Sequence, residues 1–152
     1  MDYYLLDNIE VAGFPGEQTK FVDYRYSPVI IEYLHYLFLG WLGNELIKTR
    51  HNTYLVTENL KIAIEKSNIK GIIFKDVYVT KSINYFSSID ELPVFFWMVV
   101  YGDKDVFLKR IDDIYELIVS DNFFNILKEF NISGINAVKY FPITDPFKKN
   151  PD

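Results

Sequence analysis

The sequence predicts an α+β fold: a central, mainly antiparallel sheet with two short, equivalent helices packed on it, built by an internal duplication. The first observation is that two segments repeat the order strand, capped helix, turn and strand. The second is the composition of the 152 residues, 49% hydrophobic and 24% charged, which is typical of folded globular proteins. The third is that the apolar runs at residues 29–43 and 92–101 fall short of the roughly 20 residues of a membrane-spanning helix. We therefore expect both runs to contain buried strands.

Each repeated segment begins with a short run that is typical of a strand, at residues 54–56 and again at residues 117–119. Thr57 and Ser120 follow these runs. A hydroxyl at such a position accepts a hydrogen bond from a free N–H group of the first helical turn. We therefore predict that Thr57 and Ser120 are the N-caps of the two helices.

Apolar side chains recur at helical spacing after each cap. The positions of this stripe are Leu60, Ala63, Ile64 and Ser67 in the first copy, and Phe123, Ile126, Leu127 and Phe130 in the second. Asn68 and Asn131 suit the left-handed position that ends a helix. Gly71 and Gly134 then open the next strand. The repeat thus predicts where both helices begin and end.

We expect a single domain with four parts: a preamble at 1–27, a first repeat unit at 28–80, a second at 93–143 and a loose tail at 144–152. The preamble is predicted to hold a strand at 3–6, a loop at 13–16 and an edge strand at 21–26. Within the first unit the apolar run at 29–39 favours a strand. Helical spacing leaves one helix over 32–46 as the alternative.

Composition excludes several function classes. Cysteine is absent, which excludes disulfides, thiol catalysis and cysteine-ligated metals. The formal net charge of -5 argues against nucleic acid or an anionic membrane as the main partner, because both require basic surface. The first seven residues lack the basic and apolar regions of a signal peptide, so we expect a cytoplasmic protein.

Few residues are available for catalysis. The two histidines are His35, which lies in an apolar run and is expected in the core, and His51, which is expected in a solvated turn. No nucleophile elbow, zinc-binding helix motif, phosphate loop or dinucleotide-binding motif is found. We therefore expect a protein that is not an enzyme and that needs no cofactor.

Acidic and aromatic residues are the candidates for partner binding. The acidic cluster includes Asp103, Asp105, Asp112 and Asp113. It is open to three interpretations: a charged turn with a helix cap, a patch that docks a basic partner, or a site for a hard cation, although the spacing of a calcium loop is missing. The candidate anchors are Tyr24, Arg25 and Trp41, with an outward-facing strand as the alternative for the first two.

The repeated motif resembles that of α+β immunity proteins from bacterial polymorphic toxin systems. Members of these families carry a strand, a Ser/Thr–Asp/Glu cap, a short helix, an Asn-hydrophobic-x-Gly turn and a strand. The residues that carry the resemblance are Val119-Ser120-Asp121 with Asn131-Ile132-Ser133-Gly134, and Val56-Thr57-Glu58 with Asn68-Ile69-Lys70-Gly71. The resemblance covers roughly residues 28–143, and Ser67 departs from it where the second copy has Phe130.

The resemblance implies a small cytoplasmic protein that binds and inhibits one cognate protein toxin without catalysis. It supplies no catalytic residues, and a homo-oligomer stays open. The alternative is a small-ligand-binding protein or enzyme that uses a pocket between the two repeat halves, around His35 and the carboxylates.

Overall fold

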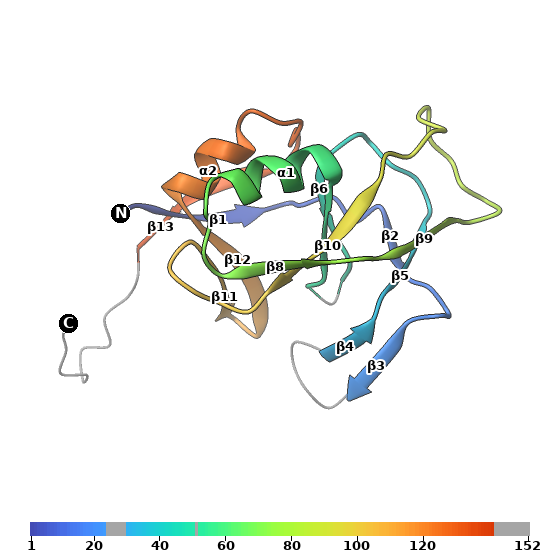
Figure 1. Ribbon diagram of the computed structural model, residues 1–152, viewed down its shortest axis with the longest axis horizontal. Helices are drawn as coiled ribbons and strands as arrows, with labels where there is room; N and C mark the ends of the chain where they lie inside the picture. The colour runs from blue at the N-terminus through green and yellow to red at the C-terminus, as the bar shows by residue number, and fades with distance from the viewer. Residues whose placement is uncertain (24–29, 51, 142–152) are drawn as a thin grey trace.

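The computed structural model describes residues 1–23, 30–50 and 52–141, which form four small sheets and two helices (Figure 1). Sheet A has the order β11 (Val106–Ile111), β12 (Ile114–Ser120), β1 (Tyr3–Asp7) and β13 (Asn136–Tyr140). Sheet B has the order β6 (Leu46–Lys48), β7 (Tyr54–Thr57), β10 (Phe95–Val100) and β8 (Ile72–Lys75). Sheet C has the order β2 (Gly13–Pro15), β5 (His35–Phe38) and β9 (Tyr78–Lys81), and sheet D pairs β3 (Lys20–Asp23) with β4 (Ile30–Tyr33). The helices are α1 (Glu58–Lys66) and α2 (Asp121–Leu127).

Sheets A and B share one arrangement. In sheet B, α1 connects β7 to β8, and β10 lies between these two strands and runs antiparallel to both. In sheet A, α2 connects β12 to β13, and β1 lies between them in the same way. The predicted pair of helices on mainly antiparallel strands is confirmed, with β5 and β9 forming a parallel pair. The internal duplication itself stays a prediction.

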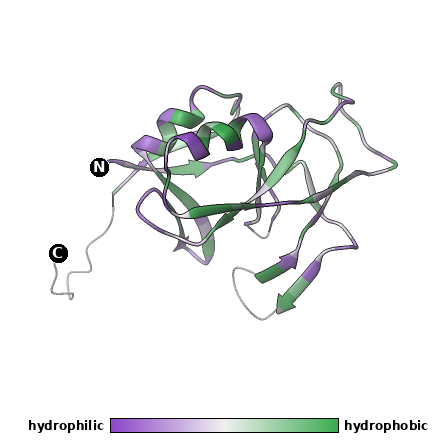
Figure 2. Cartoon of the chain, viewed as in Figure 1, coloured by the Kyte–Doolittle hydropathy of each residue, from purple (hydrophilic) through white to green (hydrophobic). Residues whose placement is uncertain are grey.

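Sheet B is packed on both faces. Successive side chains of a strand point to opposite sides, so each of its strands can contribute to two core clusters. Tyr54 and Val56 of β7 enter a core cluster with both helices and sheet A, whereas Leu55 enters a second cluster with sheet C. β10 is divided in the same way between Met98 and Trp97. Figure 2 shows hydrophobic strands beneath helices whose turns alternate between hydrophobic and hydrophilic residues.

The predicted N-caps are confirmed. The Thr57 hydroxyl accepts a hydrogen bond from the Leu60 N–H at 3.3 Å, and the Ser120 hydroxyl accepts one from the Phe123 N–H at 3.2 Å. Asn68 has a φ of 54°, as its predicted place after α1 requires. Asn131 is not left-handed, because α2 already ends at Leu127. The predicted end of the second helix is therefore wrong.

Two carboxylates tie each helix to the turn that follows the other helix. Asp105 accepts hydrogen bonds from the Ser120 hydroxyl at 2.7 Å and from the Lys70 N–H at 2.9 Å. Glu45 accepts from the Thr57 hydroxyl at 2.8 Å and from the Asn131 N–H at 3.0 Å. Each cap hydroxyl thus accepts a hydrogen bond from a backbone N–H of its own helix and donates one to a carboxylate.

We expect Thr57→Ala to lower the free energy of unfolding by about 1 kcal/mol, and Ser120→Ala by more. Ser120 is expected to have the larger effect because its partner Asp105 is buried, whereas Glu45 is only half-buried. Chemical denaturation measures both losses, with exposed Ser67→Ala as a nearly neutral control. Unchanged denaturation midpoints in both variants would contradict the assignment of the caps.

The N-terminal segment and the run that follows it differ in part from expectation. β1 lies inside sheet A rather than outside the repeated units. The predicted loop at 13–16 instead contributes β2, which pairs with β5. The run at 29–39 forms β4 and β5, so the strand prediction is confirmed and the alternative helix over 32–46 is wrong.

Candidate functional site

The acidic residues that the sequence singles out are divided between the two ends of β11. Asp103 is exposed in the turn before this strand, and Asp112 and Asp113 form the turn after it, with φ values of 51° and 66°. β11 has six residues, and at about 3.3 Å per residue its two ends lie roughly 20 Å apart. These three carboxylates therefore make neither one continuous patch nor one cation site.

Asp105 is a structural residue in this fold. It is 2% exposed, and its two oxygens accept the hydrogen bonds from the Ser120 hydroxyl and the Lys70 N–H described above. A carboxylate held in this way presents no charge to a docking partner. The prediction that Asp105 contacts a partner is therefore wrong.

Trp41 is also buried, at 8% exposed. Its indole N–H donates to the carbonyl oxygen of Asn44 at 2.8 Å, and its ring meets the edge of Phe95 at a centroid distance of 5.6 Å. Trp41 therefore belongs to the core between sheets B and C rather than standing out as an anchor. The other two predicted anchors, Tyr24 and Arg25, lie outside the described residues.

A group of exposed apolar side chains lies elsewhere, on the segment after β5 and the loop between β9 and β10. It consists of Leu39, Leu42, Ile83 and Phe86, which are 45%, 78%, 99% and 90% exposed, and we call it the loop patch. The loop projects from the body of the molecule in Figure 1. Apolar exposure of this kind marks sites of interaction with other molecules. Sequence reasoning missed this patch, and its one local signal is that the apolar Ile83 and Phe86 stand next to Ser and Asn residues in a loop.

Backbone hydrogen bonds hold the two parts of the loop patch together. The Ser82 N–H donates to the Phe38 carbonyl and the Phe86 N–H to the Leu39 carbonyl, both at 2.9 Å. A Cβ at Gly40 would lie 2.5 Å from the Phe86 oxygen, so the close approach of the two backbones requires glycine there. The loop is thus fixed at its base while its apolar side chains face solvent.

A hollow of about 400 Å³ lies at the foot of this loop, where β10 begins and α1 starts. Its lining includes the apolar Trp41 and Val94 and the carboxylate residues Glu45 and Glu58. The Glu58 N–H donates to the Val94 carbonyl at 2.9 Å, which joins the end of the loop to the helix. The hollow therefore combines apolar and acidic groups.

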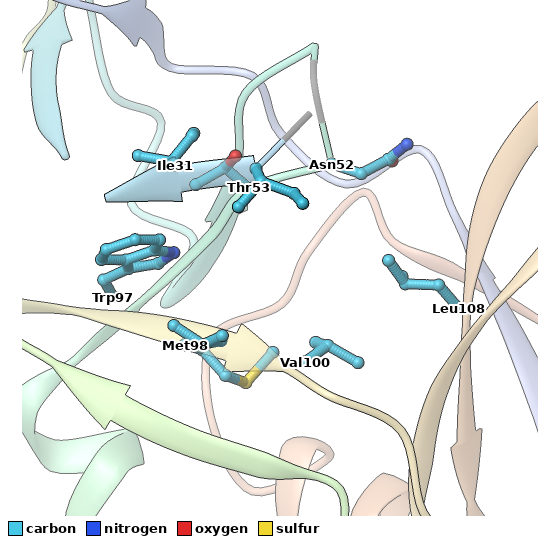
Figure 3. A pocket seen from close by; sticks show the side chains of 9 residues that line it. Ile31, Asn52, Thr53, Trp97, Met98, Val100 and Leu108 are labelled. Carbon is cyan, nitrogen blue, oxygen red and sulfur yellow. The ribbon is translucent and has the colours of Figure 1, made fainter. Parts of the chain in front are cut away.

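A second cavity, of about 210 Å³, lies between sheets A and B (Figure 3). Figure 3 shows Trp97, Met98 and Val100 of β10 on one side, Ile31 and Thr53 above them, and Leu108 of β11 opposite. The described lining residues include no ionisable side chain. This volume lies below the roughly 300 Å³ at which sites for small ligands begin. The arrangement offers little to a polar substrate.

His35 lines a third hollow, of about 450 Å³, and both of its ring nitrogens have partners. Nδ1 accepts a hydrogen bond from the Gln18 N–H at 3.2 Å, because a backbone amide can only donate. Nε2 therefore carries the proton and donates to the Thr80 hydroxyl at 2.7 Å. A general base for Thr80 would need its lone pair on Nε2. The pair has the distance of a catalytic dyad but the wrong tautomer for one.

Acid is expected to destabilise the fold through His35. Desolvation lowers the pKa of His35 below its ordinary value of 6.5, and this outweighs the nearby Glu17 carboxylate, which raises it. Because the unfolded chain takes up this proton first, the stability contributed by neutral His35 is lost as pH falls from 6.5 through the folded-state pKa. Urea unfolding of the wild type between pH 7.5 and 5 should therefore show a steeper loss of stability than His35→Gln, and parallel profiles would contradict this.

Comparison with known protein families finds none that matches the chain, and comparison with curated proteins finds no similar sequence. Within the described ranges, no helix is long and apolar enough to cross a membrane. Nor does that part of the chain bring three or more His, Asp or Glu side chains together as metal ligands.

Proposed function

We propose that this protein is a toxin-neutralising immunity protein, which binds and inhibits a cognate bacterial toxin in the cytoplasm and turns over no substrate. The observation that carries the proposal is the loop patch, because removing its four apolar side chains from water favours binding of a partner. The resemblance of the repeated motif to immunity proteins supports the kind of partner.

The way in which polar groups are used also supports a binding role. The Asp105 carboxylate and both His35 nitrogens are occupied by contacts within the fold. The alternative, a small-ligand-binding protein or enzyme with a pocket between the halves, gains little from the small apolar cavity of Figure 3. The exposed carboxylates that the sequence predicts to dock a partner, Asp103, Asp112 and Asp113, are divided between the two ends of β11, so the loop patch replaces them as the proposed docking surface.

We further propose that the two halves arose by internal duplication. Support comes from the common order of sheets A and B, each with a helix that crosses a strand from a distant part of the chain. Asp105 and Glu45 add further support, because each accepts a hydrogen bond from the cap hydroxyl of one of the two helices. A strand order alone arises without common ancestry, so the matched caps Thr57 and Ser120 are the stronger support.

Co-expression with the toxin domain encoded beside its gene tests the proposed function. We expect growth to be restored and a stable complex to be recovered by affinity purification. Protection should saturate when the two proteins are equimolar, because an inhibitor acts stoichiometrically and an enzyme does not. An unrelated toxin is the control. Correctly folded protein that neither restores growth nor forms a complex would overturn the proposal.

A further inference from the structure

The loop patch is bordered by carboxylates. Glu58 is exposed beside the hollow at its foot, and Asp90 and Glu91 are exposed on the same loop. Lys81, a basic residue at the start of this loop, has its ammonium group on the Asp90 carbonyl at 2.7 Å and over the Tyr85 ring. The border is therefore negative on balance.

Among the described residues, no ion pair cancels the charge of this border. The ion pairs of the described residues are Lys61–Glu65, Arg110–Asp113 and Lys139–Asp2, and none of them uses a carboxylate of the border. An apolar centre with a negative border is complementary to an apolar recess with a positive border.

We infer that the loop patch docks into an apolar recess of the partner protein that is bordered by Lys and Arg side chains; this rests on the proposed function. The same border disfavours a second copy of this chain as the occupant. A two-fold interface would place the carboxylates of both copies near one another, and their repulsion would oppose association. The negative border likewise opposes binding to an anionic membrane or to nucleic acid.

The apolar part is tested with the double variant Ile83→Ser and Phe86→Ser, with Ile114→Ser and Val138→Ser as the matched control. All four side chains are exposed, so neither variant should change the thermal unfolding midpoint. Calorimetric titration with the toxin domain should show affinity at least about 30-fold weaker for the loop variant, as expected for hot-spot side chains. The control should bind like the wild type.

The charged part is tested with Asp90→Asn and Glu91→Gln together, against Asp112→Asn and Asp113→Asn. Each pair removes two negative charges, so the comparison separates the location of charge from the net charge. The loop pair should associate more slowly with the toxin domain, and its association rate should depend less on salt. The variant with Asp112→Asn and Asp113→Asn, which we call the hairpin pair, should associate with the toxin domain at the wild-type rate.

The outcomes separate this inference from the proposed function. If the wild type binds the toxin domain and the loop variants bind equally well, the inference is overturned while the proposed function stands. Loss of binding in the hairpin pair instead would assign docking to the other end of the fold. If the wild type does not bind, both fall. A wild-type dimer that Ile83→Ser and Phe86→Ser dissociates would give the surface to a second copy and overturn the inference.

Discussion

Phe123→Ala should lower the free energy of unfolding by about 3–5 kcal/mol, as is usual for truncation of a buried Phe. Phe123 is 0% exposed and lies in the first turn of α2, within the core cluster that joins both helices to sheets A and B. Truncation removes the burial of an aromatic ring and leaves a cavity between elements that cannot close around it. Chemical denaturation at neutral pH and 25 °C measures the loss.

Phe130→Ala is the matched control for this prediction. Both residues fall on one predicted stripe, but Phe130 lies beyond the end of α2 and is only half-buried. Its truncation should therefore cost less than half as much as that of Phe123. Equal losses for the two variants would mean that Phe130 is as deeply buried as Phe123, contrary to the structure.

Asp105→Ala should lower the free energy of unfolding by about 3 kcal/mol or more, because a hydrogen bond to a charged group contributes about 1.5–3 kcal/mol. The substitution removes the acceptor of both the Ser120 hydroxyl and the Lys70 N–H. Ser120 is buried, so water does not easily replace the lost partner. The loss also loosens the tie between α2 and the turn after α1.

Asp103→Ala supplies the comparison for Asp105. It removes the same group two residues earlier, where the carboxylate is exposed and accepts from the adjacent Lys104 N–H. We expect a change within about 0.5 kcal/mol, as is usual for surface sites. If Asp105→Ala changed the free energy of unfolding as little as Asp103→Ala, water would be replacing its two hydrogen bonds. The Asp105 carboxylate would then not be structural.

Sequence patterns were enough to predict the features that depend on neighbouring residues. The strands before the caps, the caps Thr57 and Ser120 and the left-handed Asn68 follow from contacts within a few residues, which a pattern can report. These features were sufficient for the fold class and for the places where both helices begin.

The contacts between distant segments could not be predicted from these local patterns. β1 enters sheet A between β12 and β13, a pairing that nothing near residues 3–7 in the sequence indicates. Asp105 looks like one acidic residue among several until the fold places Ser120 and Lys70 against it. The loop patch exists because backbone contacts bring residues 39–42 beside residues 82–86. Burial and hydrogen bonding depend on neighbours in space, so the sequence identified charged and aromatic residues while the fold decided which of them face solvent.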